Sequence, residues 1–544
     1  MKQRITSPLI IVIVALAAIA AFIPDNHVLD PDIMEARNLI AAREMVEDGH
    51  WMVPTLNGNL RLEKPPLPTW LTAVTYYVSA DSLTLQRGMA GLAALLLVFY
   101  FWRFARRMLD TDPLPSTLLL LTCYSVILMG RTATWDIYCH AFQMAGIYHL
   151  ASGLQSRDKA LGQFLSAGVW TGLSILSKGP VSPYALLLPF LIAVALVDKP
   201  RMRGKWTGVA LMIITALATG TWWFIYIRLS QAEAMAAVVA KESGAWINHN
   251  TRPWWYYWKF FLEAGIWAVF LLTAIFLPFF QNQRRKERAW LLPCAWMVFS
   301  LILLSLMPEK KPRYLLPMLI PASLVMGQVV VWWQHKPDAR ALRLNSGLLA
   351  VAIAALPVLA WTILWKKGII GWELGAGLTA VCLAGVVTLY RAARHLRPMP
   401  MLWVVVCLFC FIELAGMPVV KQLVNNPYAH SLALIRQEKQ ADKIPLRHDK
   451  RDDLRPELIY AAGRCIKPLD VTRTDSLLSA LPCVLLTRKS LAESLPAEVY
   501  ASLDSIGIDT LYIDTYDNNQ RPPGNKRHSQ AFVTRATLLT HKNQ

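Results

Sequence analysis

The sequence has no Gly-rich phosphate loop, no paired Cys-x-x-Cys motifs of the zinc-binding kind and no internal repeat. These absences argue against a nucleotide-binding domain, a cysteine-based metal site and a solenoid. Charged residues make up only 17% of the chain. Six of the eight cysteines lie in or beside apolar segments, where they are expected to be small buried side chains.

Apolar residues account for 55% of the 544 residues, more than a soluble chain of this length can bury in one core. A bilayer core of about 30 Å needs roughly 20 apolar residues in a helix. The sequence therefore predicts a polytopic α-helical membrane protein of about thirteen transmembrane helices. We place these segments near residues 8–24, 86–104, 115–130, 136–154, 163–178, 181–197, 207–228, 258–280, 289–307, 314–333, 347–365, 371–390 and 400–417.

Alternate connections carry groups of basic residues, as the positive-inside rule requires of cytoplasmic loops. These residues are Arg103, Arg106, Arg107, Arg157, Lys159, Lys199, Arg201, Arg203, Lys205, Arg284, Arg285, Lys286, Arg288, Arg340, Arg343, Arg391, Arg394 and Arg397. All fall on the side of Lys2, so we expect the N-terminus in the cytoplasm of a bacterial cell and the protein in its inner membrane. The net charge of +19 then reflects topology, and no nucleic-acid partner is implied.

The first apolar segment follows Lys2 and Arg4 but precedes no convincing cleavage site, so we interpret it as an anchor. We expect residues 1–420 to form the membrane domain. Thirteen spans place residues 421–544 in the periplasm, where short apolar runs alternate with helical stretches such as 428–443 and predict a small α/β domain. Cys465 and Cys483 share that compartment, which leaves open either a disulfide or two free thiols.

The periplasmic loop 25–85 is the longest connection at the N-terminal end, and it is dense in acids, bases and prolines. Residues 35–47 have helical spacing and predict an amphipathic helix at the membrane interface, and residues 66–80 predict a second one. We expect the active site in this loop.

Other periplasmic connections carry ionisable groups at membrane depth, where such groups are costly and a functional role is the first hypothesis. They are Asp136, Lys178, His249, Arg252, Lys310, Lys311 and Arg313. Lysines and arginines on this side suit a lipid phosphate, whereas acids among them suit proton transfer or metal binding. Two structural alternatives stay open: Asp136 paired only with Arg131, and Lys178 reaching only to lipid headgroups.

Several motifs resemble those of C-type glycosyltransferases that use polyprenyl-phosphate sugars, especially the lipid A 4-amino-4-deoxy-arabinose transferases and the protein O-mannosyltransferases. The motifs are Ala42-Arg-Glu-Met, Gly49-His-Trp-Met-Val-Pro-Thr-Leu-Asn-Gly, Arg61-Leu-Glu-Lys-Pro-Pro-Leu-Pro, Asp136, Leu176-Ser-Lys-Gly-Pro and Lys311-Pro-Arg-Tyr-Leu-Leu-Pro. The resemblance thins after about residue 340.

The resemblance implies that Arg37 and Lys64 bind the phosphate of a lipid-linked donor, with Lys178 and Arg61 assisting. It also implies a zinc ion held by Glu63 and a histidine, for which His249 is the nearest candidate. Two ligands leave a zinc shell to be completed by water or substrate. Arg252, Arg313 and Tyr314 are further candidate site residues, and no nucleotide cofactor is implied.

One position departs from the family. Met34 stands where the family carries the Asp that is assigned as the base, and a methionine accepts no proton. Glu35, Asp32 or Asp136 takes this role, the acceptor is a phosphate that needs no base, or catalysis has been lost.

We therefore predict inverting transfer of a sugar from a polyprenyl-phosphate donor to a lipid A, glycolipid or protein acceptor. A lipid or solute transporter is the alternative, although the ionisable groups gather at one face instead of the midplane. A scaffold is a third reading, favoured only if catalysis is lost. The sequence identifies neither the sugar nor the acceptor.

Overall fold

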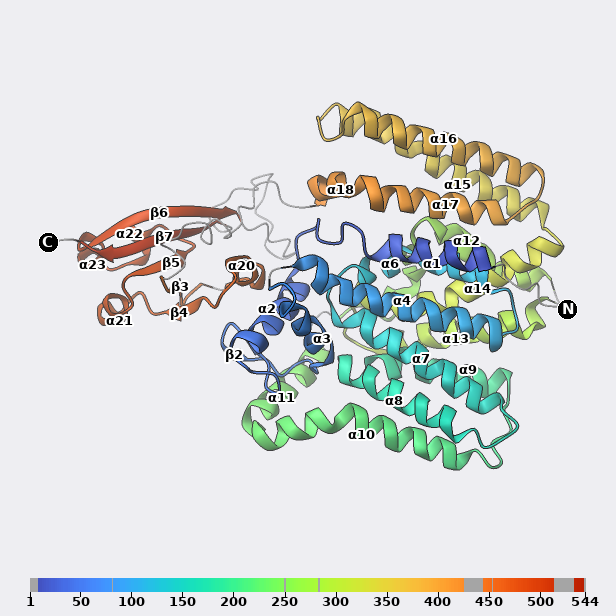
Figure 1. The fold of residues 1–544 in the computed structure, drawn as a ribbon, viewed down its shortest axis with the longest axis horizontal. Coiled ribbons are helices and arrows are strands. Elements are labelled where there is room, and N and C mark those ends of the chain that lie inside the picture. Colours follow the sequence, from blue (N-terminus) through green and yellow to red (C-terminus); the bar gives the residue numbers. More distant parts are fainter. Residues whose placement is uncertain are drawn as a thin grey trace. The chain divides into compact units, whose positions relative to one another are not determined.

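The computed structural model describes residues 8–80, 82–248, 251–281, 284–424, 444–452, 454–512 and 533–542. Contacts divide the chain into two units (Figure 1). Unit 1 comprises residues 1–28 and 62–419, and unit 2 comprises residues 29–61 and 420–544. This division differs from the one expected from the sequence, because the first part of the periplasmic loop joins the C-terminal unit.

Unit 1 is helical, and each of the thirteen predicted segments coincides with a helix or a run of consecutive helices. The helices described between residues 8 and 424, apart from α2, are α1 (Pro8–Phe22), α3 (Leu67–Tyr76), α4 (Leu83–Arg107), α5 (Pro113–Leu121), α6 (Tyr124–Gly130), α7 (Trp135–Gln155), α8 (Leu161–Lys178), η1 (Pro183–Leu187), α9 (Leu188–Val197), α10 (Trp206–Ser230), α11 (Ala232–Asn248), η2 (Trp254–Trp267), α12 (Ala268–Phe276), η3 (Leu277–Phe280), η4 (Arg284–Lys286), α13 (Arg288–Leu306), η5 (Pro312–Leu315), α14 (Leu316–His335), α15 (Ala339–Leu359), η6 (Ala360–Trp365), α16 (Trp372–Arg394), α17 (Met399–Phe411), η7 (Ile412–Gly416) and α18 (Met417–Val424).

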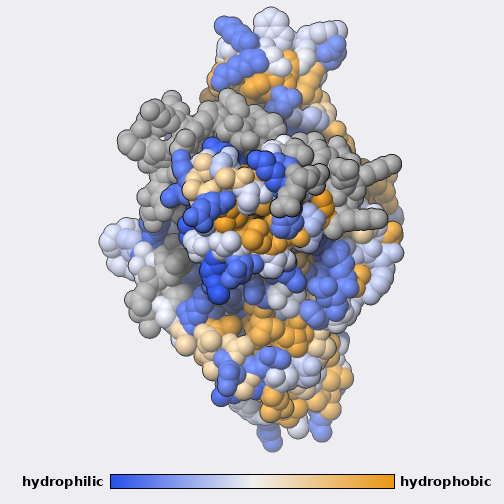
Figure 2. Space-filling model, turned by 90° about the vertical axis from the view of Figure 1, so that its left-hand side faces the viewer, coloured by the Kyte–Doolittle hydropathy of each residue, from blue (hydrophilic) through white to orange (hydrophobic). Residues whose placement is uncertain are grey.

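Within the described residues, eight helices are long and apolar enough to cross a membrane, or nine if α5 and α6, bent by 68°, form one span. α1 and the run Pro183–Val197 are apolar but shorter. Large apolar side chains such as Ile214 and Val351 are 65% and 69% exposed, and Figure 2 shows hydrophobic surface between polar groups on one face. Lipid is the solvent that suits such a surface, so the chain is a polytopic membrane protein.

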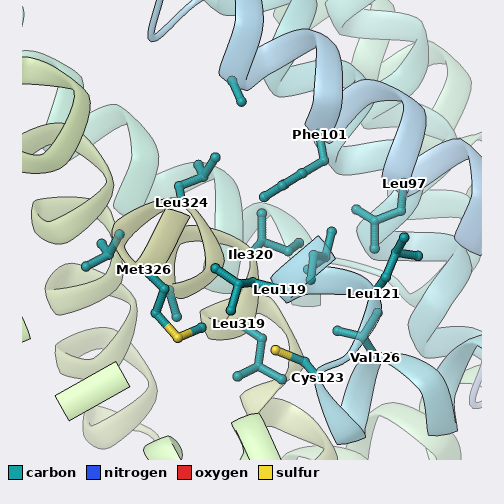
Figure 3. Close-up of a cluster of buried hydrophobic side chains, with 14 of the residues drawn as sticks. Leu97, Phe101, Leu119, Leu121, Cys123, Val126, Leu319, Ile320, Leu324 and Met326 are labelled. Carbon is teal, nitrogen blue, oxygen red and sulfur yellow. The ribbon is translucent and has the colours of Figure 1, made fainter. Parts of the chain in front are cut away.

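The bend between α5 and α6 fixes the centre of unit 1. Leu119 and Cys123 from this segment belong to one buried cluster with Leu319 and Ile320 of α14 and Phe101 of α4 (Figure 3). α14 is buried along its whole apolar window. A Cβ on Gly327 would lie 2.5 Å from the Cβ of Ser116, so α14 and α5 cross where only glycine fits.

Unit 2 contains a five-stranded sheet of order β4-β3-β5-β7-β6, in which β3 pairs in parallel with β4 and β5, and β7 pairs antiparallel with β5 and β6. The predicted C-terminal α/β domain is thus confirmed, although the expected helix 428–443 lies outside the described residues. The elements of unit 2 are α2 (Ile33–Glu47), β1 (Thr55–Leu56), β2 (Asn59–Leu60), β3 (Leu446–Asp449), α20 (Pro456–Ala462), β4 (Lys467–Leu469), α21 (Thr474–Ser479), β5 (Cys483–Thr487), α22 (Leu491–Ser494), α23 (Ala497–Ala501), β6 (Leu503–Tyr512) and β7 (Val533–His541).

The loop segment joins unit 2 through an apolar contact and a polar one. Ile40 of α2 is fully buried in a cluster with Leu446 and Ile459, and α2 lies beside α20 (Figure 1). The side chain of Asn57 donates to the carbonyl of Ile466 and accepts from its N–H, both at 2.7 Å. These contacts explain why residues 29–61 leave the membrane domain.

Three expectations for local structure have clear outcomes. Helices are present at both predicted loop positions, as α2 and α3, and the residues between the predicted spans 207–228 and 258–280 contain the 17-residue helix α11. The disulfide alternative is wrong, because Cys465 and Cys483 are both free thiols. Cys465 instead donates a hydrogen bond to Glu44 at 3.4 Å.

Candidate active site

The most deeply buried ion pair among the predicted site residues joins Lys178 to Asp136. Asp136 lies in the first turn of α7, and Lys178 is the last residue of α8. A short connection makes these helices antiparallel neighbours, so the start of one and the end of the other meet. An acid at a helix start and a base at a helix end both complement the helix dipoles.

Close packing of α7 and α8 holds this pair in register. A Cβ on Gly146 of α7 would lie 2.8 Å from the hydroxyl of Thr171, and the amide of Gln143 donates to that hydroxyl at 3.2 Å. α8 ends because Gly179 adopts a positive φ of 66°, which glycine tolerates. The Ser-Lys-Gly-Pro motif therefore ends the helix at its lysine.

The alternative in which Asp136 pairs with Arg131 is wrong. Arg131 instead forms an ion pair of 2.8 Å with Glu413, inside η7. It also donates to the carbonyls of Ala21 and Pro24. Arg131 thus ties the last spanning segment to the end of α1, and Asp136 is left to Lys178.

The charged turn formed by residues 308–314 lies against the Asp136–Lys178 pair. The ammonium of Lys178 lies 5.4 Å from the ring centre of Tyr314, and Arg313 interacts electrostatically with Asp136. Glu309 bonds Lys311 at 2.6 Å and accepts from the hydroxyl of Tyr314 at 3.4 Å. Glu309 thus holds Lys311 and Tyr314 together in this turn, which also carries Arg313.

Arg252 is brought to the same turn by backbone pairing. Thr251 and Glu309 form an isolated antiparallel bridge, and the N–H of Arg252 donates to the carbonyl of Pro308 at 3.4 Å. The predicted residues Arg252, Arg313 and Tyr314 are therefore neighbours through the segment that contains Pro308.

Glu63 and Lys64 form two ion pairs with consecutive residues of α11. Lys64 lies 4.0 Å from Glu242, and Glu63 lies 3.9 Å from Lys241. All four side chains are at least a quarter exposed. Glu242 also interacts electrostatically with Tyr314, so the pair made by Lys64 and the Asp136 cluster share one neighbourhood in unit 1.

The other predicted residues belong to unit 2 and surround the start of α2. Asp32 caps this helix, since its Oδ1 accepts from the N–H groups of Met34 and Glu35 at 2.9 and 2.8 Å. Glu35 is fully buried. Arg61 donates to the carbonyl of Arg37 at 3.0 Å. The predicted residues thus form one group in each unit.

Glu44 is a buried acid to which the sequence alone assigns no function, although it lies in the Ala42-Arg-Glu-Met motif. Glu44 is 1% exposed and accepts from the hydroxyl of Thr55 at 2.6 Å and the N–H of Asn57 at 2.7 Å. Burial, followed by the charge of Glu44, raises the pKa of the Cys465 thiol to about 12. In the sequence, only the position of Glu44 and Asn57 within motifs of the resembling family points to a role for them.

The described residues supply only part of a binding site for a metal ion. They contain no group of three or more His, Cys, Asp or Glu side chains that could hold a metal, and His249 lies outside them. Glu63 Oε2 is buried and has no hydrogen-bond partner among the described residues. A carboxylate oxygen in this state suits a cation as its partner.

Comparison with known proteins places this site in context. The family model of dolichyl-phosphate-mannose-protein mannosyltransferases matches residues 63–223. An undecaprenyl phosphate-alpha-4-amino-4-deoxy-L-arabinose arabinosyl transferase of Pseudomonas fluorescens is 28% identical over 71% of this chain and 67% of its own. One from Yersinia enterocolitica is 25% identical over 75% and 76%. The crystal structure of ArnT from Cupriavidus metallidurans bound to undecaprenyl phosphate covers 97% of both chains with 16% identity and a TM-score of 0.67.

The chain shares the fold of this ArnT structure, and these similarities favour a membrane glycosyltransferase over the transporter alternative. Its sequence is similar to the aminoarabinose transferases and, over residues 63–223, to the mannosyltransferase model.

Proposed function

We propose that the chain transfers a sugar from undecaprenyl phosphate to an acceptor at the periplasmic face of a bacterial inner membrane, with inversion at the anomeric carbon. The observation that carries this proposal is the buried Asp136–Lys178 pair beside Tyr314, in a fold shared with a protein crystallised with undecaprenyl phosphate. The N-terminus is cytoplasmic and unit 2 periplasmic in this proposal.

Lys178 and Lys64 are the cations that we assign to the donor phosphate. An ammonium group has three N–H donors, so Lys178, which is bonded to the carboxylate of Asp136, keeps two for a phosphate. Positive charge fixed before reaction stabilises the phosphate as it leaves, at little reorganisation cost. Asp136 is then a positioning residue that holds Lys178 at the end of α8. Arg37 and Arg61 belong to unit 2, and their role in binding the phosphate stays a prediction.

The carboxylates that could act as a base bear on which kind of acceptor the chain uses. Met34 accepts no proton, Asp32 is occupied in capping α2, and Asp136 is paired with Lys178. A hydroxyl acceptor gains about 10²–10⁴ from a base, whereas a phosphate is already ionised at neutral pH. We therefore favour a phosphate group on a lipid as the acceptor, with Glu35 as the remaining candidate base for a hydroxyl.

A zinc ion held by Glu63 and His249 remains part of the proposal. Glu63 Oε2 supplies one suitable oxygen. When bound, zinc would add positive charge beside the donor phosphate. Metal analysis of the purified chain by mass spectrometry, with Glu63→Gln for comparison, tests this assignment: zinc retained by wild type and lost in the variant supports it, and equal content contradicts it.

The test of the main proposal uses the purified full chain, an undecaprenyl-phosphate aminopentose donor and a phosphorylated lipid A acceptor, with product detected by mass spectrometry. Transfer by wild type that falls strongly in Lys178→Met and Lys64→Ala is the expected result. Glu35→Gln should retain activity if the acceptor is a phosphate. No transfer to phosphorylated or hydroxyl acceptors, with donors of several sugars, would overturn the proposal.

A further inference from the structure

A groove in unit 1 lies at the arginine-rich end of α4, and the proposed reaction does not use it. It has a volume of about 1060 Å³ and is open along one side. One wall is the face of α1 formed by Ile11, Val14 and Ala18, and the other is the face of α4 that includes Val98 and Trp102. Residues three or four apart lie on the same face of a helix, so each wall presents one apolar stripe.

Arginines occupy one end of this groove. Arg103, Arg106 and Arg107 line it, and the only acid among its lining residues is Asp110. Arg106 and Arg107 form the last turn of α4, where a helix end also favours cations. The groove therefore has an apolar length and a terminus with an excess of positive charge.

Contacts within the protein orient two of these arginines and leave donors over. Arg103 and Arg107 both donate to the hydroxyl of Tyr148, at 3.0 and 3.4 Å. The guanidinium of Arg103 also lies 5.0 Å from the Tyr148 ring centre. Its Nε is buried and has no hydrogen-bond partner among the described residues. A buried guanidinium N–H of this kind is costly unless an acceptor fills it.

We propose that this groove binds an anionic phospholipid, with its acyl chains along α1 and α4 and its phosphate at the three arginines. Topology alone explains basic residues in a loop, but it requires neither an adjoining apolar groove nor convergence on one phenol. Charge complementarity favours an anionic lipid, since basic side chains near a membrane surface attract such lipids. The site is independent of the transfer reaction.

The test measures lipids bound to the full chain by native mass spectrometry, in detergent supplied with phosphatidylglycerol or phosphatidylcholine. Wild type should retain phosphatidylglycerol preferentially, and Arg106→Gln with Arg107→Gln should weaken that binding on the order of tenfold. Arg391→Gln with Arg394→Gln is the matched control, because these residues also end a spanning helix but do not line the groove.

A second pair of variants tests the apolar part without changing charge. Ala15 lines the groove with an exposed side chain, so Ala15→Phe should fill it and reduce phosphatidylglycerol binding, whereas Leu16→Phe on the next residue should not. Equal binding of both lipids by wild type, or no effect of either groove variant, would overturn the proposal. Displacement of the lipid by millimolar inorganic phosphate would assign the arginines to a free anion instead.

Discussion

Two kinds of ion pair lie in the same neighbourhood of unit 1. The side chains of Lys178 and Asp136 are 7% and 2% exposed, whereas those of Lys64 and Glu242 are 27% and 41% exposed and lie at the limit of ion-pair distance. A buried pair holds its geometry, because separating it leaves a charge without solvent. An exposed pair is weak and exchanges readily. Under the proposed function, Lys178 is fixed before the donor arrives, and Lys64 is released from Glu242 to meet it.

The largest effect is expected from breaking the buried pair. Asp136→Asn leaves Lys178 as an uncompensated buried charge, so the free energy of unfolding should fall by about 3–5 kcal/mol. Chemical unfolding of the purified protein in detergent measures this change. Adding Lys178→Met to the variant should restore much of the stability and none of the transfer activity. An Asp136→Asn protein as stable as wild type would show that the pair does not hold the ends of α7 and α8.

The exposed lysine should show the opposite pattern. Lys64→Ala is expected to lower kcat/KM on the order of 10²-fold, as removal of one preorganised charge-stabilising group does. Its unfolding free energy should change by less than about 0.5 kcal/mol. Lys241→Ala removes the neighbouring exposed lysine, paired with Glu63 at a similar distance, and should leave transfer nearly unchanged. Equal losses in both variants would mean that the region needs positive charge in general.

A third way of holding a buried charge occurs in unit 2, where Glu44 is bonded by neutral donors and raises the pKa of Cys465. A thiol with a pKa of about 12 is almost entirely protonated at pH 8, so alkylation of Cys465 should be slow. Glu44→Gln should lower that pKa and speed alkylation up to about tenfold, if one pKa unit is removed. Peptide mass spectrometry after iodoacetamide treatment gives the rate. Cys483, buried in β5, is the internal control whose rate should stay the same.

The smallest effect concerns the partner that Lys64 leaves. Glu242→Gln removes an exposed ion pair, which is typically worth 0.2–1 kcal/mol, about the resolution of an unfolding experiment. If Lys64 must exchange Glu242 for a phosphate, the variant should bind the donor slightly more tightly, with KM lowered about twofold and kcat unchanged. Measuring KM at low and high salt sharpens the test, because screening should remove the difference. A raised KM would show that Glu242 orients Lys64.

The fold was predictable because its signals are local. Each spanning segment carries its own apolar length, and all thirteen segments are found as helices. α11 was missed because Ala232–Asn248, at 17 residues, is too short for a span, although its alanines favour a helix. The contact of residues 29–61 with the C-terminal unit was not predictable, since nothing near Ile40 identifies a partner beyond residue 440.

The candidate site was predictable as a set of residues and not as a set of partners. Asp136 and Lys178 were both named, yet their pairing depends on how α7 and α8 pack, and Arg131 was the nearer partner in the sequence. Lys64 was identified from a family motif, whereas Glu242 lies in a segment without a motif. Glu309 directly precedes Lys310 and Lys311 in the sequence, but only the structure shows that it bonds Lys311 and Tyr314.

The two bonds between Asn57 and Ile466 have a consequence for how the protein is made. Their partners are 409 residues apart, and a ribosome adding 5–20 residues per second needs roughly 20–80 s to cover that distance. The loop segment that carries Arg37 therefore emerges long before the strand edge that holds it, and the intervening spans must be inserted in between. The protein cannot complete the loop's native contacts until synthesis has nearly ended, which delays activity until the chain is almost whole.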